Sequence, residues 1–127
     1  MTAFNRDLQP IVKGDTKQVE RVFTGLPTGI TIDCAWLTVK ENSNSADPGL
    51  FQVVITTAIA SVGRISDAST SDGQLSMYFN INSTQTAAAT AGRRYIYDIQ
   101  ARDGATGEIY TLVMGTVTFV DQITAAS

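Results

Sequence analysis

The sequence predicts an all-β domain in which two antiparallel sheets pack face to face as a sandwich. Several segments alternate apolar and polar side chains with a period of two, which is typical of strands that bury one face. Turn formers such as Asp72-Gly73 separate these segments at short intervals. The chain has 127 residues, of which 43% are hydrophobic and 17% charged, as in a single domain with its own core.

The clearest strands lie in the second half of the chain. Residues 75–81 alternate strictly, residues 94–101 form a second strand, and residues 109–120 form a third. The alternation of the third slips around Gly115, where we expect a bulge or a bend. The predicted core between the two sheets consists of Trp36, Leu75, Met77, Phe79, Tyr97, Ile99, Val117 and Phe119.

The first half has the same character with weaker patterns. Residues 18–24 and 51–55 read as strands, and residues 30–39 read as a longer one. In the last of these the apolar parity changes between Trp36 and Leu37, so that either a bulge lies there or both faces are covered. Segment 58–71 is ambiguous between a short extra strand and an ordered loop.

One stretch favours a helix. Residues 83–91 are rich in alanine, Ser83 can cap the start, and Gly92 can end it. The stretch is at most a few turns long. We therefore expect an immunoglobulin-like antiparallel β-sandwich of about 7–8 strands with one short helical turn near 83–91.

The composition argues against enzymatic chemistry. The chain has no histidine and a single cysteine, Cys34, which removes histidine bases, catalytic triads, disulfides and clustered thiolate metal sites. We expect no catalytic, cofactor-binding or metal-binding residues. We expect Cys34 to be a buried, unreactive thiol, because no histidine is present to activate it.

Charge and hydropathy bear on the partners. A net charge of −3 provides no basic field for nucleic acid. No segment has the roughly 20 apolar residues of a membrane span, and the start shows no signal peptide. The sequence therefore favours neither nucleic acid nor membrane as a partner, and it predicts residence in a cytoplasm or in a particle assembled there.

Tyr95 is a candidate for a structural role known from immunoglobulin-like sandwiches. There a tyrosine entering the penultimate strand bonds back across the preceding corner, the tyrosine corner. Tyr95 follows Gly92 and the alanine-rich turn at a suitable position. The alternative is an ordinary inward aromatic side chain. The neighbouring Arg93-Arg94 pair favours a polar rim over an anion site.

Several pieces of the chain also resemble a known family in the family's order. The matching pieces are Lys13-Gly14-Asp15-Thr16, the strand with Phe23, Gly29-Ile30-Thr31-Ile32-Asp33, Trp36-Leu37-Thr38-Val39-Lys40, Ala46-Asp47-Pro48-Gly49-Leu50-Phe51-Gln52, Asp72-Gly73-Gln74-Leu75, Gly92 to Gln100, and Gly107-Glu108 with residues 111–119. Together they resemble the immunoglobulin-like N-terminal domain of upper baseplate proteins, and related small tail proteins, of tailed bacteriophages. The resemblance spans about residues 11–124, and segment 58–71 is longer than the family's usual connection.

The resemblance implies a non-enzymatic structural protein of the virion. The favoured role is a tail or baseplate component that connects fibres to the tail, as a symmetric oligomer with other phage structural proteins. The alternative is a capsid decoration (cement) protein that stabilises the phage head. A third possibility, from another class, is a carbohydrate-binding module that uses exposed aromatic residues such as Tyr78 and Tyr110.

The ends of the chain lie outside this resemblance. Residues 1–10 form an N-terminal arm, residues 11–124 the sandwich domain, and residues 125–127 a C-terminal tail. Pro10 interrupts any continuous ladder, and the arm has little apolar surface to bury. We therefore expect it to be mobile in the isolated protein, with Phe4 and Leu8 as anchors for a partner subunit.

Overall fold

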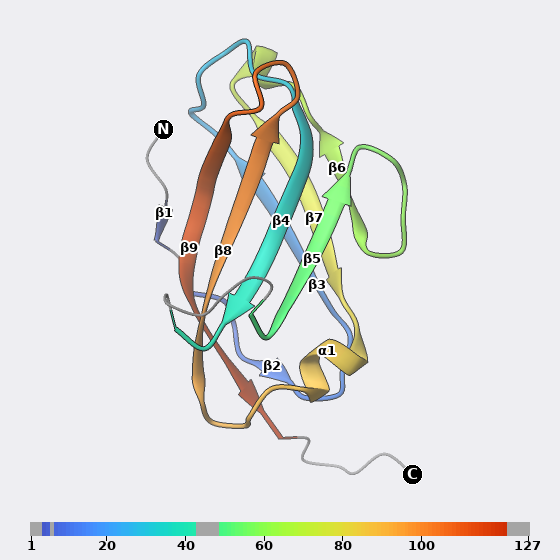
Figure 1. Cartoon of the computed structure of the whole chain (residues 1–127), viewed down its shortest axis with the longest axis vertical. Helices are drawn as coiled ribbons and strands as arrows, with labels where there is room; N and C mark the ends of the chain where they lie inside the picture. The colour runs from blue at the N-terminus through green and yellow to red at the C-terminus, as the bar shows by residue number, and fades with distance from the viewer. Residues whose placement is uncertain (1–3, 6, 43–48, 122–127) are drawn as a thin grey trace.

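The computed structural model describes residues 4–5, 7–42 and 49–121 of the chain. Two sheets pack face to face, with one short helix at one end of the sandwich (Figure 1). The elements in chain order are β1 (Phe4–Asn5), β2 (Ile11–Val12), β3 (Lys17–Phe23), β4 (Ile32–Lys40), β5 (Phe51–Thr56), β6 (Gly63–Asp67), the 3₁₀ turn η1 (Thr70–Asp72), β7 (Leu75–Ile81), α1 (Ser83–Ala87), β8 (Arg94–Asp103) and β9 (Ile109–Val120).

The strand order is that of an immunoglobulin-like sandwich. Among the described residues, one sheet has six strands in the order β1-β9-β8-β4-β5, with β2 also on β9, and the other has three in the order β3-β7-β6. β3, β7 and β6 thus take the places of immunoglobulin strands B, E and D. β9, β8, β4 and β5 take those of G, F, C and C′. The predicted all-β sandwich is confirmed.

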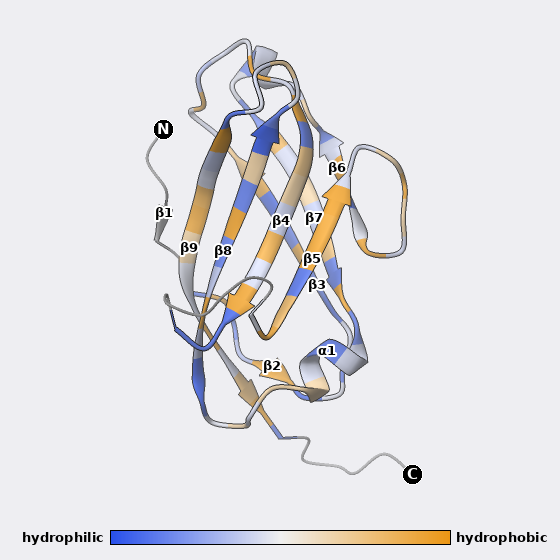
Figure 2. Cartoon of the chain, viewed as in Figure 1, coloured by the Kyte–Doolittle hydropathy of each residue, from blue (hydrophilic) through white to orange (hydrophobic). Residues whose placement is uncertain are grey.

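The core lies between the two sheets and is built by side chains of one parity in each strand. Along β8 hydrophobic and hydrophilic residues alternate, as Figure 2 shows, and every second side chain from Tyr95 to Asp103 is buried. The buried cluster includes seven of the predicted core residues, Leu75, Met77, Phe79, Tyr97, Ile99, Val117 and Phe119. Phe51 and Phe119 add an edge-to-face ring contact.

Trp36 is the exception, and its prediction was wrong. The register of β4 against β8 shifts between Ile32 and Cys34, so a bulge lies at Asp33 and not near residues 35–37. After the bulge Leu37 and its inward neighbours occupy the core, and Trp36 turns to the outer face, where it is half-buried. One extra residue therefore inverts the face on which the tryptophan lies.

A second bulge in the same sheet also lies away from its predicted place. β8 and β9 change register between Ile99 and Gln100, where Leu112 is the extra residue, and Leu112 and Val113 are both buried. Gly115 instead stays in the regular ladder opposite Tyr97. Two successive buried side chains are the signature of this bulge, and the glycine is not its cause.

The ambiguous segment 58–71 and the predicted helical stretch both contain regular structure. Part of segment 58–71 forms β6, which pairs with β7, and the turn η1 follows. The short helix α1 is capped by Asn82 and not by Ser83: the Asn82 side chain accepts from the Gln85 N–H, and the Gln85 side chain accepts from the Asn82 N–H. Gly92 follows with φ of 78°, as a residue in the turn to β8 requires.

The N-terminal segment lies along the edge of β9, so the prediction of a mobile arm was wrong. β1 and β2 both pair with β9 in parallel. Between them the Leu8 N–H donates to the Thr116 carbonyl at 2.9 Å, and the Thr116 N–H donates to the Asp7 carboxylate at 3.0 Å. Backbone hydrogen bonds therefore hold the segment on β9, although the segment has little apolar surface to bury.

Leu8 and Phe4 are the two residues of the N-terminal segment that were predicted to anchor a partner subunit. Leu8 packs partly buried against the chain's own core, so it is not the free anchor that was expected. The side chain of Phe4 lies outside the described residues, and so do the turn at 46–48 and the tail at 125–127.

Candidate functional site

The outer face of the larger sheet is the strongest candidate for a site. This outer face points away from β3, β7 and β6, and cross-strand pairing places its residues in rows. The successive rows are Val54, Trp36, Gln100 and Thr111; Gln52, Thr38, Asp98 and Met114; and Lys40, Ile96 and Thr116.

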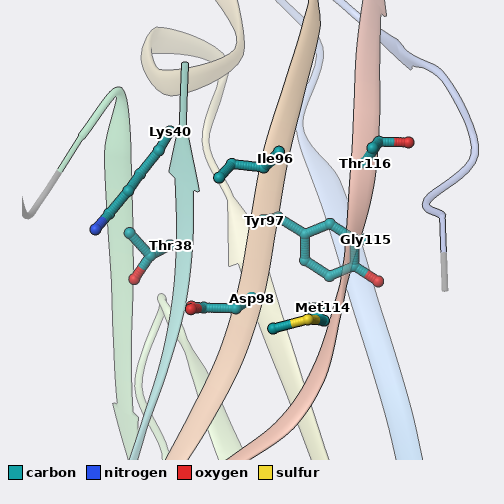
Figure 3. A pocket seen from close by; sticks show the side chains of 8 residues that line it. All are labelled: Thr38, Lys40, Ile96, Tyr97, Asp98, Met114, Gly115 and Thr116. Atoms are coloured by element: carbon teal, nitrogen blue, oxygen red, sulfur yellow. The ribbon is translucent and has the colours of Figure 1, made fainter. Parts of the chain in front are cut away.

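A hollow of about 400 Å³ lies on this face over the second and third rows. Figure 3 shows side chains from three strands around it. The lining residues are Thr38 and Lys40 from β4, Ile96, Tyr97 and Asp98 from β8, and Met114, Gly115 and Thr116 from β9. Its lining is mainly apolar, with a few polar groups, as in sites that bind an apolar group in a fixed orientation.

Large apolar side chains lie in the lining of the hollow and in the row next to it. Met114, in the lining, is 49% exposed. Val54, which is 43% exposed, and Trp36 are register partners in the row next to the hollow. Ile96 is half-buried. Apolar residues grouped in this way on one face indicate a contact surface, whereas single exposed ones are ordinary.

An ion pair marks one end of the outer face. Arg102 Nε and Nη2 donate to the two carboxylate oxygens of Asp33 at 2.9 and 3.0 Å. The hydrogen bond from Arg102 holds the pKa of Asp33 below its usual value, and the same bond raises the pKa of Arg102. This fork holds the bulged start of β4 against β8.

The other end of the sheet carries basic side chains. Lys40 ends β4 and Arg94 begins β8. Arg93 contacts Glu41 at 3.4 Å and lies 5.7 Å from the centroid of the Tyr95 ring. These contacts hold Arg93 at the rim, the reading that the sequence favoured for this arginine pair.

Tyr95 makes the hydrogen bond of a tyrosine corner. Its side chain is buried, and its hydroxyl oxygen accepts from the backbone N–H of Thr90 at 2.8 Å.

Cys34 is also buried, but on the outer-face parity of β4 and outside the main core cluster. Burial raises the pKa of the Cys34 thiol, which disfavours the reactive thiolate.

The two aromatic residues considered for carbohydrate binding do not form one platform. Tyr78 lies on β7 in the smaller sheet, and Tyr110 lies on β9 in the larger one. The Tyr110 hydroxyl donates to Glu108 at 2.8 Å, and its ring packs against the core. The two rings therefore cannot stack together on one sugar.

Within the described ranges, no three acidic, cysteine or histidine side chains gather as metal ligands, and no helix has the length and apolarity to cross a bilayer. What the described surface offers is an apolar hollow flanked by charges. The sequence analysis does not identify this hollow, because the face of Met114 depends on the bulge at Leu112 and only the cross-strand register brings the lining residues of β4, β8 and β9 together.

The chain matches no protein-family model, and no curated protein matches its sequence. A functional assignment therefore depends on the fold, the surface and the motifs in the sequence.

Proposed function

We propose that the chain is a non-enzymatic structural protein of a tailed-bacteriophage virion, a tail or baseplate component that connects fibres to the tail. It works by presenting a preformed sandwich surface to neighbouring subunits of the particle. The protein needs no cofactor in this role, because it acts only by binding its neighbours in a fixed geometry.

The observation that carries the proposal is the coincidence of family-like motifs with the matching elements of the sandwich. The run from Gly92 forms the entrance to β8, where Tyr95 closes a tyrosine corner. The run that contains Trp36 forms the strand at the place of immunoglobulin strand C. Asp72-Gly73 forms the turn before β7. This correspondence supports the family resemblance on which the role depends.

The outer face supports the same role. An exposed apolar hollow on a rigid sheet is suited to binding another folded protein, because little side-chain order is lost on contact. Repeated around a symmetric particle, such a modest contact gains from avidity. Neither the apolar hollow nor the repeated contact requires a substrate.

Mass spectrometry of particles purified on a density gradient tests the proposal. We expect the protein in intact particles at a fixed ratio to the capsid subunit, and in the tail fraction after heads and tails are separated. Recovery with the heads would favour the capsid decoration alternative. Complete absence from particles would overturn the structural role in both forms.

A further inference from the structure

We propose that the free edge of β3 binds an extended acidic segment of another polypeptide. The segment adds a strand beside β3 and places one carboxylate in a cleft that Lys17 and Arg21 line. In strand addition of this kind, main-chain hydrogen bonds supply affinity and a side-chain contact supplies specificity. The surface is separate from the hollow on the larger sheet, and the inference is independent of the proposed place in a virion.

Among the described residues, the smaller sheet has no strand at the place of immunoglobulin strand A. The usual sheet is ABED, whereas β3, β7 and β6 fill the places of B, E and D. The N-terminal segment, which would supply strand A, pairs instead with β9 in the larger sheet. β3 therefore pairs with β7 on one side, and no described strand pairs with the other side of its seven residues. Such an edge is a template for an added strand.

A cleft of about 100 Å³ lies between β3 and the N-terminal segment. Its lining includes Leu8 and Ile11 from the N-terminal segment, and Lys17, Val19 and Arg21 from β3. The three β3 residues share the inward parity of the strand, because they alternate with Gln18 and Glu20. The cleft has room for a carboxylate group, since a water molecule takes about 30 Å³ of liquid volume.

Two cations border this cleft without a carboxylate of their own. Within the described ranges, neither Lys17 nor Arg21 forms an ion pair. Arg21 Nη1 donates to the Glu20 carbonyl at 2.7 Å, but Arg21 Nε is buried and has no acceptor. A buried N–H without an acceptor costs free energy, and a carboxylate accepts from a guanidinium in a charge-assisted, often bidentate, pair. A carboxylate in the cleft supplies that acceptor once the guanidinium turns toward it.

The same cations select the strand that can bind. An inward cation on an edge strand disfavours pairing with an apolar strand, because the charge would lose water without compensation. A carboxylate opposite Lys17 and Arg21 removes this penalty, so the edge favours an acidic partner. The other free edges are less suited: β5 has no charged side chain, and β6 has a bulge between Ile65 and Asp67.

Isothermal titration calorimetry of the full chain with two matched peptides tests the proposal. Both peptides have seven residues, as β3 has, and alternate Thr and Val, with Glu at the centre of one and Gln at the centre of the other. We expect the Glu peptide to bind with a dissociation constant of about 100 μM and the Gln peptide to bind at least about tenfold more weakly. No binding of the Glu peptide at about 1 mM, or equal binding of the two peptides, would overturn the proposal.

Matched variants locate the carboxylate. Arg21→Gln should remove the preference for the Glu peptide, so that the two peptides bind within about twofold of each other. Lys17→Gln, at an exposed position, is the second variant if Arg21→Gln fails to fold, and it should reduce the preference by about threefold. The control Arg64→Gln removes the same charge from β6, at the opposite edge of the sheet, and should leave the preference within about twofold of wild type. A preference that survives substitution on β3, or that Arg64→Gln removes equally, would overturn the assignment.

Amide chemical shifts locate the added strand. On titration with the Glu peptide, the largest changes should fall on the N–H signals of β3, because the new main-chain hydrogen bonds form there. Largest changes on β5 or β6, the other edge strands, would overturn the placement of the partner beside β3.

Discussion

The hydroxyl oxygen of Tyr95 accepts a hydrogen bond from the backbone N–H of Thr90, 2.8 Å away, across the corner between α1 and β8. The ring of Tyr95 meets Phe119 edge to face, with the centroids 5.6 Å apart. One side chain thus joins the corner to the core, which gives the loop after the short helix a defined path.

Replacing Tyr95 by Phe should lower the free energy of unfolding by about 1–2 kcal/mol, because the Thr90 N–H loses its partner while the ring remains. Urea denaturation measures the change. Tyr110→Phe is the matched control: it removes an exposed hydroxyl that donates to Glu108 and should cost less than about 0.5 kcal/mol. Equal losses in the two variants would contradict the role of the corner.

Phe79→Ala should be far more costly, about 3–5 kcal/mol, because Phe79 is fully buried in β7 between the two sheets. The loss combines the transfer free energy of the ring with the cavity that remains. Guanidinium denaturation measures it. A loss below about 1 kcal/mol would place Phe79 outside the core.

Acid should weaken the contact between the N-terminal segment and β9. Hydrogen bonds from Thr116 lower the pKa of Asp7 below the ordinary value of 3.8. The folded state therefore binds this proton less readily than the unfolded state, so the contribution is present above about pH 4 and is lost as pH falls further. Asp7→Asn removes the titration but keeps an acceptor oxygen for the Thr116 N–H.

The pH dependence of unfolding in urea tests this assignment. The free-energy difference between wild type and Asp7→Asn should be largest near neutral pH and should decrease below about pH 4, where wild-type Asp7 becomes protonated. A difference that stays constant down to acid pH would show that Asp7 does not titrate through this contact.

Deleting residues 2–9 should reduce the unfolding free energy by about 1–2 kcal/mol, since the Leu8 hydrogen bond and its apolar packing are lost. Differential scanning calorimetry would show a lower melting temperature. An unchanged melting temperature would mean that the segment does not lie on β9 in solution and would favour the earlier expectation of a mobile arm.

Cys34 should react slowly with a thiol reagent in the native protein, because it is buried and the pKa of its thiol is raised. Labelling in urea should be faster by about tenfold or more, and the unfolded chain serves as its own control. Rapid native labelling would show that the outer side of β4 is open at this position.

The core could be predicted where strands alternate without interruption. Residues 75–81 fix their register by their own pattern, since a slip of one residue would expose Met77 and Phe79 together. The face of Trp36 could not be predicted, because it depends on a bulge at Asp33 that is set by pairing with β8.

The hollow and the N-terminal strand were beyond the sequence for a related reason. Thr38, Asp98 and Met114 come from three strands, and only the cross-strand register brings them together. β1 is held through backbone groups, and these leave no trace in side-chain patterns. The apolar pattern along a single strand therefore predicts which of its side chains are buried. Which residues meet at a surface site depends on the register between strands, and the sequence does not show that register.

The parallel run of β1 and β2 along β9 has a mechanical consequence. Tension that draws Phe4 and Asp121 apart along the strands pulls the first and last strands past each other (Figure 1). Bonds such as that from the Lys13 N–H to the Val120 carbonyl are then loaded in shear together and are not peeled open singly. The force that the domain withstands depends on its unfolding rate under load. Because these bonds must break together, we expect the edge of β9 to be the part of the sandwich that resists stretching.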